Sequence, residues 1–233
     1  MEFPVAEPLR IELDGTRSVS GLWLRPARAR AALVLGHGAG AGMTHRPMET
    51  LARNLADVDI ATLRYQFPFM EQGSKRPDPP AVAHAAVRAA VATAGGLASD
   101  LPQIAGGRSF GGRMTSQAQA TSPLPGILGL IFFAFPLHPV NRPADERGRH
   151  LFQVRVPMLF LQGTGDALAD LQHLQPLCDR LGERATLKLI SEADHSFHVL
   201  ARSGRSDAEV RREMLDAVDS WLDRVISAQN TTR

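Results

Sequence analysis

The chain has 233 residues, of which 44% are hydrophobic and 21% charged, a length and balance typical of one domain with a sizeable core. The formal net charge of +2 arises without a basic run or a basic stripe with interleaved aromatic residues, so no nucleic-acid partner is expected. No segment approaches about 20 consecutive apolar residues, and the N-terminal residues lack the pattern of a signal peptide, so we expect no membrane segment and a cytoplasmic location.

The first strands are predicted from two kinds of pattern. Residues 9–13 and 19–24 alternate apolar with polar side chains on either side of Asp14-Gly15, which predicts an antiparallel hairpin. Residues 31–35 are continuously apolar and end in the glycine-rich loop 36–42. A continuous apolar run of this length is typical of a parallel strand that is buried on both faces.

The rest of the chain alternates predicted helices with predicted strands. Helices are expected over residues 46–55, 81–91, 114–120 and 171–181 and after a capping box at 206–209, and strands over 60–64, 101–105, 127–133, 157–162 and 185–190. This alternation predicts an α/β fold with a doubly wound, mostly parallel sheet. We expect one domain over residues 1–233 with a frayed tail at 229–233. The short connection between residues 133 and 157 leaves no room for a large cap domain.

A candidate nucleophile lies in the G-x-S-x-G pattern formed by Gly107, Ser109 and Gly111. Small residues two positions either side of a serine are needed where a strand turns sharply into a helix, because a Cβ atom there would collide with the neighbouring elements. The predicted strand before this motif and the predicted helix after it supply that context. A glycine-rich turn without chemistry is the alternative.

A serine hydroxyl needs a histidine to accept its proton and a carboxylate to orient the histidine. Asp166 follows the predicted strand 157–162, and His195 follows the predicted strand 185–190. Among the familiar serine hydrolases, the chain order serine, acid, histidine belongs to the α/β-hydrolase fold. Asp170 and Asp194 are the rival acids.

An oxyanion hole requires backbone amides that point at the developing negative charge. The amide of Phe110, directly after the nucleophile, and the amide of Ala39, in the loop 37–40, are the candidates. His37 is then expected to order its loop. The single cysteine, Cys178, excludes an intrachain disulfide and a CxxC metal site, and the histidines show no metal-ligand spacing, so no metal and no cofactor are expected.

Three arginines and one aromatic residue are candidates for binding the substrate. Arg108 and Arg113 flank the nucleophile, and Arg64 ends a neighbouring strand, so each of them is placed to hold a carboxylate. The alternative is that they pair with Glu71, Asp78 or other acids and brace loops. Phe67 belongs to an apolar stretch of the irregular loop 65–80, which either lines a pocket or covers the core.

These motifs in combination resemble the dienelactone-hydrolase-like α/β-hydrolases. The resemblance rests on residues 107–113, 37–40, 64–69, 76–80, 163–166 and 194–197. It is nearest to the uncharacterised branch that includes testis-expressed and chromatin-complex homologues in animals. Phe110, where that branch usually has methionine, and Gly165, where it has a bulkier residue, depart from its pattern and alter the expected pocket lining.

The sequence therefore predicts a serine hydrolase that cleaves a carboxylic ester or a related acyl bond of a small-molecule substrate. A binding or scaffold protein on the same fold, and a peptidase or acyltransferase with the same triad, are the alternatives. Nothing in the residues decides the acyl chain length, or whether the chain forms a homodimer.

Overall fold

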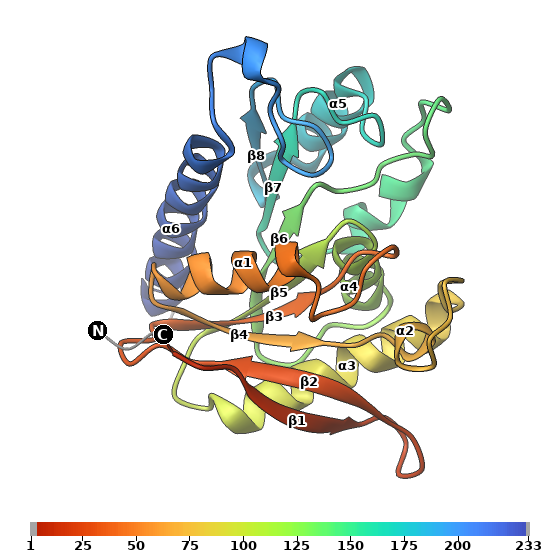
Figure 1. Cartoon of the computed structure of the whole chain (residues 1–233), viewed down its shortest axis with the longest axis vertical. Helices are drawn as coiled ribbons and strands as arrows, with labels where there is room; N and C mark the ends of the chain where they lie inside the picture. Colours follow the sequence, from red (N-terminus) through yellow and green to blue (C-terminus); the bar gives the residue numbers. More distant parts are fainter. Residues whose placement is uncertain (1–3, 232–233) are drawn as a thin grey trace.

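The computed structural model describes residues 4–231. Within them, eight strands form one sheet in the order β1-β2-β4-β3-β5-β6-β7-β8 (Figure 1). Strand β2 pairs antiparallel with β1 and with β4, and all the other pairs are parallel. The strands are β1 (Glu7–Glu12), β2 (Ser18–Leu24), β3 (Ala31–Gly36), β4 (Ile60–Tyr65), β5 (Gln103–Arg108), β6 (Ile127–Phe133), β7 (Met158–Gly163) and β8 (Ala185–Ile190).

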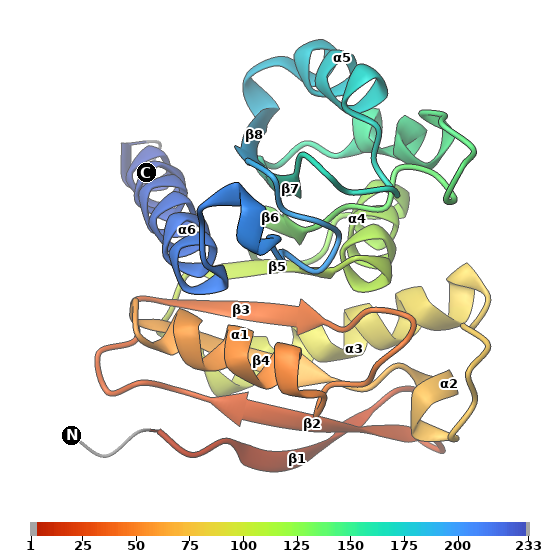
Figure 2. The same cartoon turned by 45° about the horizontal axis from the view of Figure 1, so that its top comes forward.

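Helices cover both faces of this sheet (Figure 2). The α-helices are α1 (Arg46–Ala56), α2 (Pro68–Glu71), α3 (Pro80–Leu97), α4 (Phe110–Thr121), α5 (Leu171–Leu181) and α6 (Asp207–Thr231), and the 3-10 helices are η1 (Glu146–Gln153), η2 (Gly182–Arg184) and η3 (Ala201–Ser203). Side chains of α1 and α6 share one core cluster with strand residues, whereas those of α3, α4 and α5 share another. The predicted doubly wound α/β fold with an N-terminal hairpin and no large cap is confirmed.

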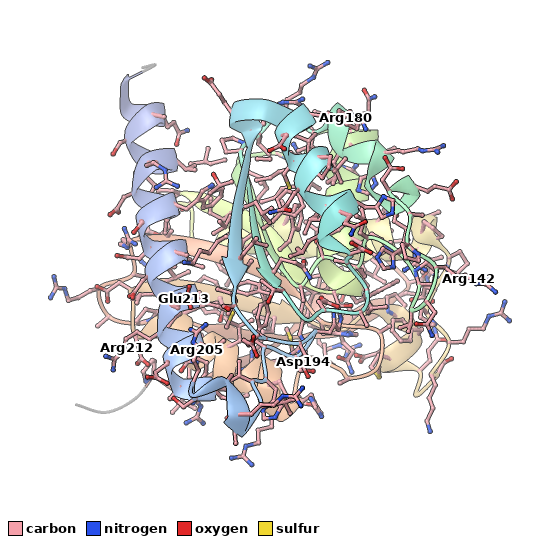
Figure 3. The ribbon with its side chains drawn as sticks, turned by 90° about the horizontal axis from the view of Figure 1, so that it is seen from above. Arg142, Arg180, Asp194, Arg205, Arg212 and Glu213 are labelled. Carbon is pink, nitrogen blue, oxygen red and sulfur yellow. The ribbon has the colours of Figure 1, made fainter. Side chains whose placement is uncertain are left out.

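The last helix is held to the sheet by packing and by charge. Trp221 of α6 is buried, and a Cβ atom on Gly129 of β6 would lie only 2.6 Å from its ring. Glu213 of α6 accepts from Arg205 at 2.5 Å and from Lys188 of β8 at 2.7 Å, and Figure 3 shows Arg205 near Glu213. The C-terminal helix α6 is therefore fixed against β6 and β8 of the sheet.

Several predicted boundaries differ from the observed ones. Strand β5 runs from Gln103 to Arg108, later than the expected 101–105, because its glycines fit between two neighbouring strands: a Cβ atom on Gly106 would lie 1.9 Å from the carbonyl oxygen of Ile131. Helix α3 continues to Leu97, since its alanine-rich face stays buried beyond residue 91. The irregular loop predicted over 65–80 contains the short helix α2.

The chain ends were also predicted from sequence. The tail expected at 229–233 coincides up to Thr231 with the last turn of α6, and positions 232–233 lie outside the described residues. Between β6 and β7 the connection contains only η1. No helix within residues 4–231 has the length and apolar content needed to cross a membrane.

Candidate active site

Ser109 lies at the junction of β5 and α4 in a strained backbone conformation. Its φ is 51° and its ψ is −114°, a region that residues with a side chain rarely adopt. The turn is possible because glycines stand where the neighbouring backbone leaves no space for a side chain. A Cβ atom on Gly107 would lie 2.4 Å from the oxygen of Gly36, and one on Gly111 would lie 2.4 Å from the same residue. The strand-to-helix turn predicted from G-x-S-x-G is thus present.

The structure brings Ser109, His195 and Asp166 into one hydrogen-bonded chain. The Ser109 Oγ donates to His195 Nε2 at 2.9 Å, and His195 Nδ1 donates to Asp166 Oδ2 at 2.7 Å. The Asp166 side chain is fully buried, while 28% of the His195 side chain is exposed. With its proton on Nδ1, the imidazole presents an unprotonated nitrogen to the hydroxyl, which is the arrangement that a general base requires.

Asp166 is oriented by two further donors. Its Oδ1 accepts from the amide of Leu168 at 2.8 Å, and its Oδ2 accepts from Gln162 Nε2 at 2.5 Å. Gln162 is completely buried on β7 and was not among the residues proposed from sequence. A signal was present, because Gln162 is a polar residue in an otherwise apolar strand four positions before the acid.

The two amides proposed for the oxyanion hole border the same cavity as Ser109. This cavity has a volume of about 290 Å³ and is lined by residues that include Ala39 and Phe110. Phe110 is the first residue of α4, where backbone N–H groups have no partner within the helix. Neither amide donates a hydrogen bond inside the described part of the chain, so both are available to a ligand.

His37 has the ordering role that was expected of it. Its Nδ1 donates to the carbonyl of Gly38 at 2.7 Å, and its Nε2 accepts from the amide of Phe67 at 3.0 Å. Both ring nitrogens are therefore engaged with backbone groups, and the residue is completely buried. Burial lowers the pKa of His37 to about 4, so the ring is neutral at physiological pH.

Two guanidinium groups face the cavity beside Ser109. Arg113 of α4 and Arg147 of η1 both line it, and neither forms an ion pair with a carboxylate in the described part of the chain. The buried Nε atom of Arg113 has no hydrogen-bond acceptor there. Burial and then the positive charge of Arg147 lower the pKa of Arg113. Arg147 was not predicted, because it lies in a connection that carries no recognisable motif.

The other residues proposed for substrate binding lie elsewhere. Arg64 donates to the carbonyl of Met43 at 3.0 Å, and Phe67 is completely buried with its ring 5.1 Å from that of Phe110. Arg108 lines a different cavity, between α1 and α6. None of the three lines the cavity that contains Ser109, so within that set the geometry favours Arg113 alone.

The loop-bracing alternative is supported by backbone contacts, since Arg64 donates to Met43 and Arg108 to His195, but not by ion pairs. Glu71 pairs with Arg10 at 2.6 Å, and Asp78 accepts from the amide of Phe69 at 2.8 Å. The salt bridges of the described residues include none made by Arg64, Arg108 or Arg113.

The rival acids, Asp170 and Asp194, and the nearby histidine His198 are engaged in other contacts. Asp194 accepts from the amides of Ser196 and His198 and shapes the loop that carries His195, and Figure 3 shows where it lies. Asp170 caps α5 by accepting from Gln172. His198 bonds to Asp207 at 3.0 Å. Across residues 4–231 no group of three or more histidine, cysteine or carboxylate side chains is arranged to hold a metal ion.

Comparison with known proteins gives one family and several similar folds. The family described as "Alpha/beta hydrolase domain" matches residues 29–223. A dienelactone hydrolase from Anabaena variabilis superposes with a TM-score of 0.75 at 16% identity, covering 96% of this chain and 99% of its own.

Two further solved structures have the same overall fold. A serine hydrolase without a lid from Xanthomonas campestris has a TM-score of 0.70 at 19% identity, over 93% of this chain and 95% of its own. A cold-adapted esterase from an Arctic intertidal metagenomic library has a TM-score of 0.69 at 22% identity, over 94% of this chain and 95% of its own. At these identities the similarity establishes the fold.

Proposed function

The chain belongs to the alpha/beta hydrolase domain family, and from this premise we propose that it is a serine hydrolase that cleaves a carboxylic ester or a related acyl bond. The observation that carries the proposal is the hydrogen-bonded chain from Ser109 through His195 to Asp166. The esterases and the dienelactone hydrolase among the structures of similar fold are consistent with it. On the motifs of the sequence, we place the chain nearest to the branch that includes testis-expressed and chromatin-complex homologues in animals.

In the proposed mechanism His195 acts first as a base and then as an acid. Its Nε2 takes the proton of Ser109 as Oγ attacks the acyl carbonyl, while Asp166 holds the imidazolium in place. The amides of Ala39 and Phe110 stabilise the oxyanion of the tetrahedral intermediate. His195 then gives the proton to the leaving group, and water, activated by the same nitrogen, hydrolyses the acyl-enzyme.

The lining of the cavity indicates the kind of acyl group. A volume of about 290 Å³ suits a small substrate. Its lining has two guanidinium groups without an ion pair in the described part of the chain, those of Arg113 and Arg147, and one carboxylate, that of Asp78, which accepts from the amide of Phe69. A partly buried guanidinium without a paired carboxylate is stabilised by a ligand that supplies one. We therefore include in the proposal an acyl group that carries a carboxylate or a comparable anionic group.

Covalent labelling tests the nucleophile. A fluorophosphonate should form an adduct that peptide mapping places on Ser109, and Ser109→Ala should abolish both the adduct and the hydrolysis of p-nitrophenyl acetate. Ser122→Ala, at the exposed end of α4, should behave as the unmodified chain. Absence of labelling in a folded protein would favour the non-catalytic alternative.

Paired substrates test the acyl group separately. The p-nitrophenyl monoester of succinate should have a higher kcat/KM than p-nitrophenyl butyrate, and Arg113→Gln should lower the value for the anionic ester about tenfold, the loss of roughly one charged hydrogen bond. Arg149→Gln, on the exposed side of η1, is the matched control. Equal rates for both esters would contradict the anionic acyl group and leave the hydrolase assignment standing.

A further inference from the structure

A second cavity lies between α1 and α6, in the helix layer on the other face of the sheet from α4. Its volume is about 430 Å³, within the range of pockets that hold small organic ligands. It shares no lining residue with the cavity that contains Ser109. Its wall nevertheless includes Arg108, which precedes Ser109, and Ser196 and Phe197, which follow His195.

Part of the lining of this cavity is apolar, and Thr50, Asn54 and Ser196 add uncharged polar groups to it. Phe133 at the end of β6, Phe197 and Met214 are buried side chains that form part of its lining, and Leu51 and Leu215 continue the apolar surface onto the two helices. A ligand that covered this apolar surface would remove it from water, which favours binding.

Three arginines also line the cavity: Arg46 on α1, Arg108 at the end of β5 and Arg211 on α6. None forms an ion pair in the described part of the chain. The one hydrogen bond of the Arg108 side chain is a long contact of 3.4 Å to the carbonyl of His195. Burial lowers the pKa of Arg108, an effect that the more distant Asp194 and Asp166 oppose.

The single carboxylate of the lining is already engaged. Asp207 accepts from His198 Nδ1 at 3.0 Å and from the amide of Val199 at 3.1 Å, and Arg211 acts on it only through its charge. The cavity therefore combines a partly apolar lining with an excess of positive charge.

We propose that the cavity between α1 and α6 binds an amphipathic carboxylate, with its alkyl chain against Phe133, Phe197 and Met214 and its carboxylate held by Arg46, Arg108 and Arg211. A planar guanidinium donates two parallel hydrogen bonds to a carboxylate, and the apolar part of the lining accepts the alkyl chain. The site is distinct from the proposed acyl cavity, and its existence does not depend on turnover.

Calorimetric titration of the full chain with sodium decanoate below its micelle concentration tests this proposal. Decanoate should bind, and decyltrimethylammonium, which has the same chain with the opposite charge, should not. Arg211→Gln should weaken decanoate about tenfold, whereas Arg113→Gln, in the Ser109 cavity, should leave its Kd unchanged. Thr50→Trp, which places a ring in the cavity from α1, should abolish binding, with thermal melts verifying that each variant is folded.

Three results would overturn the proposal. Decanoate that fails to bind would show that the arginines remain solvated. Equal binding of decyltrimethylammonium would reduce the site to an apolar groove. A Kd that responds to Arg113→Gln and not to Arg211→Gln would place the ligand beside Ser109 instead. Because binding is measured without hydrolysis, failure here leaves the hydrolase assignment unaffected, and failure of that assignment leaves this test intact.

Discussion

The two cavities near the proposed triad are built by different means. The cavity at Ser109 depends on the backbone: a serine at φ 51°, glycines without space for a Cβ atom, and amides with no internal acceptor. The cavity between α1 and α6 is lined largely by side chains of two helices and is the larger of the two. Positions with no space for a Cβ atom tolerate few substitutions, whereas a lining of side chains is easily altered. We therefore expect substitutions to affect catalysis at Ser109 and ligand binding between α1 and α6 very differently.

The largest expected difference is between the two histidines of one loop. His195→Ala removes the proposed general base and should lower kcat about 10⁴-fold. His198 faces Asp207 on the α6 side, and His198→Ala should retain most of the activity. Steady-state kinetics on p-nitrophenyl acetate measures both. Comparable losses in the two variants would mean that the loop as a whole, and not one imidazole, is needed.

Backbone crowding at the nucleophile predicts the next effect. Gly111→Ala places a Cβ atom 2.4 Å from Gly36, which should lower the free energy of unfolding by about 3 kcal/mol or more. Gly96→Ala, in α3, has nothing within 4 Å of the new Cβ and should stabilise the chain by up to about 1 kcal/mol. Denaturant unfolding compares them. An unperturbed Gly111→Ala variant would show that the turn has more space than the contacts indicate.

His37 and His198 should contribute to the pH dependence of stability with opposite signs. His37 is buried with its pKa lowered to about 4, so the unfolded chain binds the proton more readily. Its stabilising contribution is therefore present above about pH 6.5 and is lost as the pH falls toward 4, by about 3 kcal/mol. The hydrogen bond to Asp207 raises the pKa of His198. The stabilising contribution of the His198–Asp207 pair is therefore present at low pH and is lost as the pH rises.

Unfolding free energies between pH 4 and 8 separate these two contributions. His37→Gln should flatten the acidic part of the profile, and His198→Ala should remove the smaller contribution of opposite sign. A profile with the same acidic slope in His37→Gln as in the unmodified chain would place the titrating group elsewhere, for example at His150, whose pKa burial also lowers to about 4.

The smallest effect is expected at the residue behind the acid. Gln162→Leu removes one of the hydrogen bonds that orient Asp166 and should lower kcat about tenfold while KM stays nearly constant, since a hydrogen bond to a charged group is worth about 1.5–3 kcal/mol. Gln172→Leu, on the exposed start of α5, is a matched control. A KM effect with constant kcat would argue for a contact with substrate instead.

The residues of the proposed triad could be predicted because each follows a strand whose own pattern is visible in the sequence. Ser109, Asp166 and His195 follow the parallel strands β5, β7 and β8, and parallel strands bring their C-terminal ends to one edge. Arg147 could not be predicted in this way, because it reaches the cavity through η1, in a connection without periodicity. The bounds of β5 were also missed. Glycine is disfavoured in strands, so Gly106 and Gly107 were not expected to continue the strand, but the close approach of β6 requires a residue without a side chain at Gly106.

The placement of the arginines shows why sequence proximity is a weak guide to a site. Arg108 directly precedes Ser109 and Arg113 follows it by four residues, yet the two arginines line different cavities. A strand residue beside the turn points to one face of the sheet, whereas a residue one helical turn later lies above the other. The direction of each side chain was thus decided by the change from strand to helix at Ser109.

The residues of the proposed triad are far apart in the sequence, and this separation affects how the protein folds. Ser109 and His195 are 86 residues apart, and His195 and Asp166 are 29 apart. Such contacts form only after most of the chain has been ordered, which slows folding and leaves partly assembled states without function. During synthesis the proposed nucleophile leaves the ribosome well before the proposed base does. The proposed hydrolysis would therefore report directly on completed folding, and its onset in a refolding experiment should coincide with the last structural transition.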